Sequence, residues 1–354
     1  MSTPLPDALR TVPARIRESP GRDYEDFVVG DIYEHRPGRT ITQQDNIWFS
    51  LLTMNQHPVH CDEEFGRTTE FGRCIVCSPL TVSVLVGLSV RDVSYRAIAN
   101  LGWREIRMTA PVFAGDTITA TSEVIGLKEN SNRKTGIVYV RTRGFKQDGT
   151  PVLEYARWVM VRKRDEKAPA PGDHVPRLPS AVEPKLLGAA CPPLAVKAYD
   201  LALAGSPYRY DDYQTGEKID HIDGITVEEA EHQIATRLYQ NTARIHFDQF
   251  TATQGRFGKR LIYGGHAISL ARAISFNGLA NAFHISAING GRHVAPLFAG
   301  VVVAGWGRLP AWTTWPVVVA LAGVLGWGSG ETLTGHPRPP ARDFLGLALE
   351  VDPL

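Results

Sequence analysis

Residues 78–90 read Ser78-Pro-Leu-Thr-Val-Ser-Val-Leu-Val-Gly-Leu-Ser-Val90 and form a long apolar run. Ser78 is a suitable cap for a helix, and the apolar side chains that follow, among them Leu80, Val84 and Leu88, are suited to burial. The run therefore predicts a long buried helix that begins at Ser78.

Four strand-like segments follow this helix. They are rich in Val, Ile, Thr and Tyr and are separated by turn residues such as Asp148-Gly149. The segments are 101–108, 117–127, 135–145 and 152–161. Residues 42–52, before the apolar run, show a helical pattern with a threonine cap. A long helix followed by an antiparallel meander predicts an α+β unit in which a curved sheet wraps the helix.

The chain contains the marks of this unit twice. Tyr24-Glu-Asp-Phe-Val-Val-Gly30 recurs 186 residues later as Tyr210-Asp-Asp-Tyr-Gln-Thr-Gly216. The blocks 55–60 and 71–73 recur with the same offset, and block 111–115 recurs at 296–300, one residue out of step. Repeated blocks in one order indicate two copies of one fold.

The repeat sets the expected organisation. We expect an N-terminal tail over residues 1–22, a first copy over 23–164, a Pro- and Ala-rich linker over 165–206 and a second copy over 207–300. Residues 301–354 contain no lysine and no tyrosine but four of the seven tryptophans. An altered reading frame near codon 301 would explain this change, and a divergent but folded end is the alternative. Either way, this stretch is not expected to form the missing strands, and without them the second copy would be incomplete after residue 300 and would lack most of its sheet.

Charge and cysteine content exclude several classes of protein. Among 354 residues, 38 Lys and Arg balance 37 Asp and Glu, so the net charge of +1 disfavours binding to nucleic acid or to an anionic membrane. Four cysteines are too few for a disulfide scaffold. The single Cys74-x-x-Cys77 lacks a second pair or suitably spaced histidines, so no metal is expected.

Hydrophobic segments are short throughout. No apolar run follows the N-terminus, and the longest apolar stretch, 316–327, is shorter than the roughly 20 residues that span a bilayer. The sequence therefore predicts a cytoplasmic protein.

Each copy carries an Asn-x₄-His loop after a helix, with an aspartate two residues beyond the histidine. These residues are Asn55, His60 and Asp62 in the first copy and Asn241, His246 and Asp248 in the second. A single histidine in a loop is more often structural than catalytic. Its recurrence at the same place in both copies favours a shared role, although a shared folding need gives the same pattern.

The first copy resembles the MaoC-type, R-specific enoyl-CoA hydratases, a family with a double hot-dog fold. The family loop is Asp-x-Asn-Pro-[Leu/Ile/Val]-His, in which Asn55, Pro58 and His60 take the aspartate, proline and histidine positions. In the second copy Asn241 and His246 match, and Arg244 replaces the proline. Longer blocks resemble the mesaconyl-CoA hydratases, or β-methylmalyl-CoA dehydratases, within this family. They are 128–141, 239–247, 260–266 and 276–283.

This resemblance implies reversible addition of water to a 2-enoyl-CoA thioester without a cofactor, most closely mesaconyl-CoA to β-methylmalyl-CoA. In the family, an aspartate and a histidine hold and deprotonate the water, and backbone N–H groups near the start of the central helix stabilise the enolate oxygen. An asparagine cannot be a base, so the histidine must take the proton alone. Asp62 and Asp248 are candidates for the missing carboxylate, with helix capping as their alternative role.

The sequence favours the second copy as the catalytic one. Tyr263-Gly264-Gly265-His266 resembles the glycine-containing helix start of the family, where Gly264 and Gly265 would let the thioester approach the backbone. In the first copy Ser78 can still donate, but the next residue is a proline without an N–H. We therefore expect Asn241 and His246 to be catalytic, with Asn55 and His60 as the alternative.

A substrate with a free carboxylate needs a cation. Arg244, inside the second loop, is the best candidate because an arginine fork matches a carboxylate. The weaker candidates are Arg260, Arg292, His293 and the Arg133-Lys134 turn.

Two other functions stay open. A hot-dog thioesterase would need a carboxylate on the central helix, and neither 78–90 nor 264–275 contains an acidic residue. A non-catalytic acyl-CoA-binding protein is the other alternative, since both loops have asparagine in place of aspartate. A homodimer is also open, although a fused double copy satisfies the pairing of hot-dog units internally.

Overall fold

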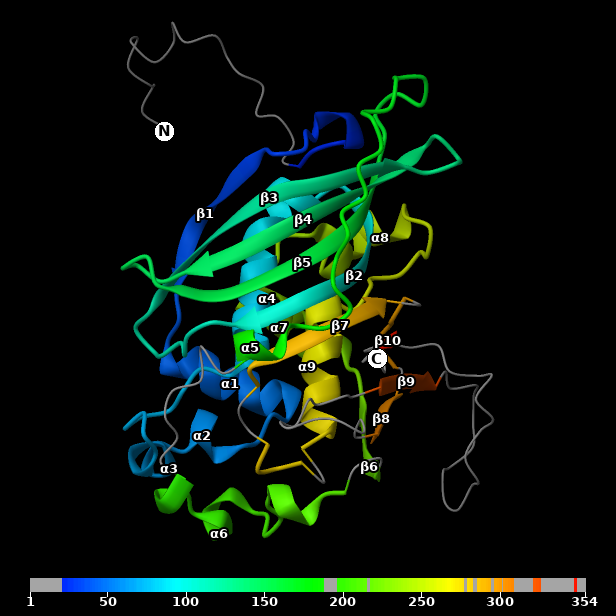
Figure 1. The fold of residues 1–354 in the computed structure, drawn as a ribbon. Coiled ribbons are helices and arrows are strands. Elements are labelled where there is room, and N and C mark those ends of the chain that lie inside the picture. The colour runs from blue at the N-terminus through cyan, green and yellow to red at the C-terminus, as the bar shows by residue number, and fades with distance from the viewer. Residues whose placement is uncertain are drawn as a thin grey trace, which may run out of the picture.

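A ten-stranded antiparallel sheet wraps two central helices, α4 (Ser78–Ser89) and α9 (Gly264–Ile274), in the computed structural model of the chain (Figure 1). The structure describes residues 21–187, 196–214, 217–276, 279–282, 285–293, 296–300, 302–308, 321–325 and 347–348. Among these residues, no helix combines the length and apolar character needed to cross a membrane.

Both copies have the same strand order. The first contributes β1 (Ile32–Thr40), β2 (Ala97–Met108), β3 (Thr117–Glu129), β4 (Thr135–Phe145) and β5 (Pro151–Arg162), arranged β1-β3-β4-β5-β2. The second contributes β6 (Lys218–Thr226), β7 (Ala287–His293), β8 (Val302–Arg308), β9 (Leu321–Leu325) and β10 (Leu347–Ala348), arranged β6-β8-β9-β10-β7. Antiparallel pairing of β2 with β7 joins the two halves into one sheet. The predicted double hot-dog fold is confirmed.

Three segments of the C-terminal stretch lie in the sheet. β8, β9 and β10 occupy the places that β3, β4 and β5 hold in the first copy. The expectation of a second copy without most of its sheet is therefore wrong for these segments, because short antiparallel strands of this composition still pair through their backbones. The remaining residues between 309 and 354 lie outside the described part of the chain. The altered reading frame stays a prediction, which translation of the gene in its three frames tests.

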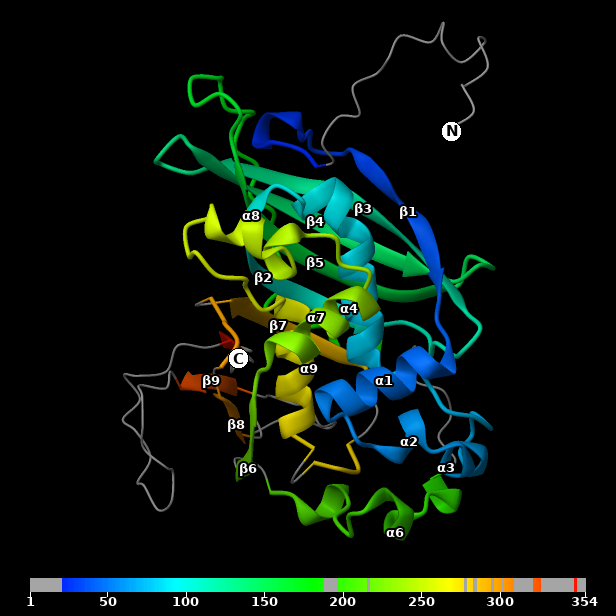
Figure 2. The same cartoon turned by 180° about the vertical axis from the view of Figure 1, so that it is seen from behind.

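Helices cover the side of the central pair that faces away from the sheet. The sheet faces the viewer in Figure 1, whereas α1 (Gln43–Thr53), α7 (Glu229–Leu238) and α8 (Gln249–Thr253) face the viewer in Figure 2. Short helices follow α1 and α7, namely α2 (Pro58–Cys61), α3 (Glu63–Thr68) and η6 (Arg244–His246). The remaining short elements are η2 (Tyr24–Asp26), η3 (Val90–Ser94), α5 (Pro184–Leu187), η4 (Val196–Ala198), α6 (Leu201–Ala204) and η5 (Tyr210–Asp212).

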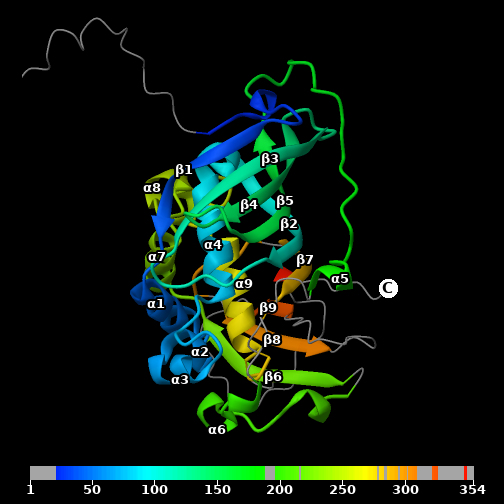
Figure 3. The same cartoon turned by 60° about the vertical axis from the view of Figure 1, so that its left-hand side comes forward.

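The predicted buried helix is confirmed as α4. Its residues from Pro79 onward are buried, among them Leu80, Val84 and Leu85. Cys77 rather than Ser78 is the N-cap, because the helix already includes Ser78, with Pro79 in its first turn. α4 and α9 lie side by side inside the curve of the sheet (Figure 3).

Gly87 lets α4 approach the second copy closely. A Cβ added at Gly87 would lie 1.9 Å from the carbonyl oxygen of Tyr239, at the end of α7. We expect Gly87→Ala to lower the free energy of unfolding by about 3 kcal/mol, because an overpacked backbone contact must move apart. Gly172→Ala is the control, since a Cβ there meets nothing within 4 Å. Equal denaturant midpoints for the two variants would contradict this interpretation of the helix contact.

Candidate active site

Asn55 is held by two hydrogen bonds from its amide nitrogen. Its Nδ2 donates to Thr53 Oγ1 at 2.8 Å and to the carbonyl oxygen of Ser269, in α9, at 3.0 Å. Thr53 Oγ1 donates its own hydroxyl proton to the Phe49 carbonyl oxygen, so both partners of Asn55 Nδ2 act as acceptors. The amide orientation is thereby fixed, and Oδ1 is left as the acceptor in the pocket. An aspartate here would set a carboxylate oxygen against the Ser269 carbonyl, which explains why asparagine suits this position.

His60 presents one ring nitrogen as a base. Its Nδ1 lies 3.0 Å from the carbonyl oxygen of Ile75, which can only accept, so Nδ1 carries the proton. Nε2 is then the unprotonated nitrogen, and it has no hydrogen-bond partner among the described residues. Burial, with a smaller contribution from Arg272 and against the opposing hydrogen bond to Ile75, lowers the pKa of His60 to about 4, so the ring is neutral at pH 7.

Asn46 fixes the loop against the start of α4. Its Nδ2 donates to the carbonyl oxygens of His60 and Ile75, and its Oδ1 accepts from the backbone N–H of Cys77. Asn46 is fully buried, so this arrangement ties α1, the loop and the central helix together without competition from water. The sequence reading missed this positioning residue.

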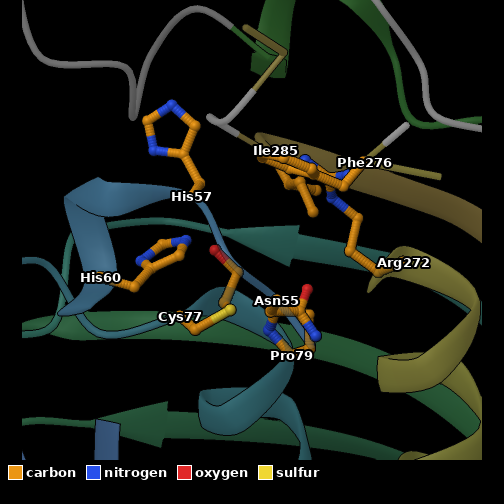
Figure 4. Close-up of a pocket in the computed structure, with 9 residues that line it drawn as sticks. Asn55, His57, His60, Cys77, Pro79, Arg272, Phe276 and Ile285 are labelled. Atoms are coloured by element: carbon orange, nitrogen blue, oxygen red, sulfur yellow. The ribbon is translucent and has the colours of Figure 1, made fainter. Parts of the chain in front are cut away.

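A pocket brings Asn55 and His60 together with the first turn of α4. It is lined by Asn55, His57, His60, Cys77, Ser78, Pro79, Arg272, Phe276 and Ile285 (Figure 4). The first N–H groups of a helix have no partner within the helix, so the Ser78 N–H is available to an oxygen in the pocket. Arg272 lies in α9 and Phe276 lies just after it. The second copy therefore completes a pocket whose loop belongs to the first copy.

His57 connects the pocket to the linker between the copies. Its Nδ1 accepts from the Val59 N–H, so its Nε2 carries the proton and donates to Tyr199 Oη at 2.7 Å. Tyr199 then donates to Asn281 Oδ1 at 3.0 Å. The sequence reading missed all three residues. His57 occupies the asparagine position of the family loop, and this match could have identified it as a candidate site residue.

The equivalent loop of the second copy packs against an aromatic ring. His246 Nδ1 lies 2.9 Å from the Leu261 carbonyl, as His60 does from that of Ile75. However, Asn241 Oδ1 accepts from the Ala243 N–H at 2.9 Å, so this acceptor is in use. The ring of Tyr263 packs 5.5 Å from that of His246 and against Gly265. Tyr263 is at the repeat position of Cys77, which lines the pocket of the first copy.

The predicted glycines have packing partners. A Cβ at Gly264 would lie 2.4 Å from the ring of His293, and one at Gly265 would lie 2.5 Å from the Tyr263 ring. His293 accepts from the Trp103 indole at 2.9 Å, and burial lowers its pKa to about 4. The suggestion that His293 supplies a cation is therefore wrong at neutral pH.

Both aspartates cap helices. Asp62 accepts from the N–H groups of Glu64 and Phe65 at the start of α3, and Asp248 accepts from those of Phe250 and Thr251 at the start of α8. Helix capping is the alternative that the sequence reading left open for them.

The other predicted cations lie away from this pocket. Arg244 is exposed on η6, and Arg260 pairs with Glu229. Arg133 and Lys134 form the turn between β3 and β4, where Lys134 pairs with Glu166 at 3.4 Å. In the ranges that the structure describes, no cluster of three His, Cys, Asp or Glu side chains is arranged to hold a metal ion.

Fold and pocket together define a class of protein: a double hot-dog protein with a buried asparagine and a neutral histidine beside the start of a buried helix. Comparison with known proteins agrees. The family model described as MaoC like domain matches residues 26–144, within the first copy. Two relatives are the β-methylmalyl-CoA dehydratase of Chloroflexus aurantiacus, 49% identical over 83% of this chain and 84% of its own, and the mesaconyl-CoA hydratase of Cereibacter sphaeroides, 48% identical with the same shares.

Solved structures show the same architecture. A MaoC domain protein, a putative dehydratase from Chloroflexus aurantiacus, superposes with a TM-score of 0.84 at 42% identity, covering 94% of this chain and 96% of its own. A double hot-dog protein from Mycobacterium tuberculosis, at 22% identity over 88% of this chain and 94% of its own, has a TM-score of 0.66 and supports the fold alone. The chain belongs to the MaoC-like family of hydratases and dehydratases and is a hydro-lyase.

Proposed function

We propose that the chain adds water reversibly to mesaconyl-CoA, a 2-enoyl-CoA thioester, to give β-methylmalyl-CoA. The names of two relatives that are nearly half identical over most of the chain support this substrate. The single observation that carries the proposal is the pocket lined by Asn55, His60 and Ser78, in which the hydrogen bonds of Asn55 Nδ2 and His60 Nδ1 leave Oδ1 and Nε2 as acceptors. We place the reaction in the first copy, at Asn55 and His60, instead of at Asn241 and His246.

The reaction requires a base, a second acceptor and an oxyanion donor. Asn55 Oδ1 accepts one hydrogen of the water, and His60 Nε2 removes the other as the oxygen bonds to the β-carbon. The electron pair of the double bond moves through the α-carbon to the thioester oxygen, where the Ser78 N–H meets the developing charge. The proton on His60 then returns to the α-carbon, so no cofactor and no net proton are needed.

The first test is the loss of enoyl-thioester absorbance when purified protein is added to mesaconyl-CoA, with crotonyl-CoA alongside. We expect loss with mesaconyl-CoA and little with crotonyl-CoA. Loss with crotonyl-CoA alone would retain a hydratase but exclude the proposed substrate. Release of free thiol would instead identify a thioesterase, and no change with folded protein would identify an acyl-CoA-binding protein.

A further inference from the structure

Among the described residues, Arg272 is a cation without a carboxylate partner. It lies in the last turn of α9, where Nη1 donates to Ser275 Oγ at 3.1 Å and Nη2 donates to the Ala282 carbonyl at 2.9 Å. Both partners are neutral, and within the described ranges no acidic side chain pairs with this guanidinium. Arg272 is partly buried, and an arginine that loses hydrating water normally gains a counter-ion, because the loss of hydration is unfavourable. Burial accordingly lowers the pKa of Arg272.

The guanidinium belongs to the pocket of the first copy. Arg272 lines it together with Asn55 and His60, and lies beside Phe276 and Ile285 (Figure 4). Burial lowers the pKa of His57 and of His60, and the charge of Arg272 adds a smaller effect in the same direction.

We propose that Arg272 binds the free carboxylate of a dicarboxylic enoyl-CoA and thereby sets the substrate specificity of the pocket. This inference rests on the proposed function and names the residue that distinguishes its substrate class. In β-methylmalyl-CoA the hydroxyl group and the carboxylate are on the same carbon, the one that water attacks. The cation that binds this carboxylate must therefore lie in the same pocket as the residues that hold the water.

Arg272 meets this requirement, and Arg244 does not. Arg244 is exposed on η6 of the second copy, whereas Arg272 reaches the pocket of the first. A guanidinium can bind both oxygens of a carboxylate at once and so orient the carbon that carries it. The bound carboxylate would also offset the positive charge beside His60, which favours the protonated ring that forms during the reaction.

The test compares substrates with and without the carboxylate. We expect Arg272→Gln to lower kcat/KM for mesaconyl-CoA by about 100-fold or more, because two charge-assisted hydrogen bonds are lost. Crotonyl-CoA has a methyl group in place of the carboxylate and also lacks the α-methyl group of mesaconyl-CoA, and its turnover by the variant should stay within about threefold of the wild-type value or rise. Arg272→Lys keeps the positive charge but loses the planar guanidinium, so its kcat/KM for mesaconyl-CoA should lie between that of the wild type and that of Arg272→Gln. Arg91→Gln, at an exposed position on η3, is the matched control.

A binding measurement separates this inference from the reaction. Succinyl-CoA and butyryl-CoA are saturated probes that differ in one carboxylate, so calorimetry reports recognition even if no hydration is found. We expect the wild-type protein to prefer succinyl-CoA by at least about tenfold and Arg272→Gln to lose that preference. Retention of the preference in this variant would overturn the inference, whatever the turnover shows. So would an equal fall in turnover of both enoyl-CoA substrates, which indicates a structural role. Failure of the wild-type protein to hydrate either substrate would overturn the proposed function instead.

Discussion

Replacement of His60 by glutamine should lower kcat/KM for mesaconyl-CoA hydration by about 10²–10⁴-fold, the usual contribution of a general base. His60 Nε2 is the unprotonated nitrogen in the pocket because Nδ1 donates its proton to Ile75. A glutamine side chain can still donate to that carbonyl and fills a similar volume, but it cannot take a proton from water. Steady-state absorbance assays of mesaconyl-CoA hydration at several pH values measure this loss of kcat/KM.

The equivalent variant in the second copy decides which site works. Because the ring of Tyr263 packs against that of His246 and Asn241 Oδ1 is engaged by Ala243, we expect His246→Gln to keep activity within about threefold of wild type. Thermal unfolding of both variants checks that any fall in activity does not come from a loss of folded protein. A large fall for His246→Gln with an active His60→Gln would return the reaction to the second copy, as the sequence first indicated.

The repeat made much of the fold predictable. Blocks spaced by 186 residues predicted two equivalent units, and the apolar run after Ser78 predicted the central helix. The strand expected at 101–108 begins at Ala97 in the structure, since the small residues before Leu101 pair with β5 although their composition is not strand-like. The composition of residues 302–308 did not predict a strand, but these residues pair with β6 through their backbones and form one.

The site was harder to predict because contacts between the two copies decide which side-chain atoms are available in the pocket. Local sequence favoured the second loop for its glycines, but those glycines accommodate His293 and Tyr263. The free acceptor of Asn55 depends on the Ser269 carbonyl, 214 residues away along the chain. Arg272 did leave a signal, since it is the one Lys, Arg, Asp or Glu in the apolar stretch 264–275. A charge on an otherwise buried helix indicates a function or a partner.

Acid should unfold the protein at a mildly low pH, because four buried histidines are held neutral. His57, His60, His232 and His266 are each less than a tenth exposed. Burial lowers the pKa to about 2 for His57 and His232 and to about 4 for His60 and His266. The geometry agrees, because one ring nitrogen of His57 and one of His232 accept a backbone N–H and cannot also carry a proton.

The direction follows from proton binding. In the unfolded chain these histidines take up protons as the pH falls through about 6.5, whereas in the folded chain they do not until pH 4 or below, so acid favours the unfolded state. Each histidine costs on the order of 2 kcal/mol at pH 5, and the four together about 8 kcal/mol, which is comparable with the whole stability of a typical protein. Carboxylates such as Glu154, whose pKa is lowered by Arg143 and Arg141 against the opposing effect of burial, lose their stabilising charge only at still lower pH.

Thermal unfolding at pH 7, 6 and 5 measures the effect, and we expect Tm to fall by more than about 10 °C across this range. His266→Leu tests its origin, since Leu80 holds the equivalent place in the first copy. Removal of one buried histidine should reduce the difference between pH 7 and pH 5 by about 2 kcal/mol. His174→Gln, on the surface, is the control and should leave the difference as it is in the wild-type protein. A Tm that is equal at pH 7 and pH 5 would mean that these histidines accept protons within the folded chain, which their hydrogen bonds oppose.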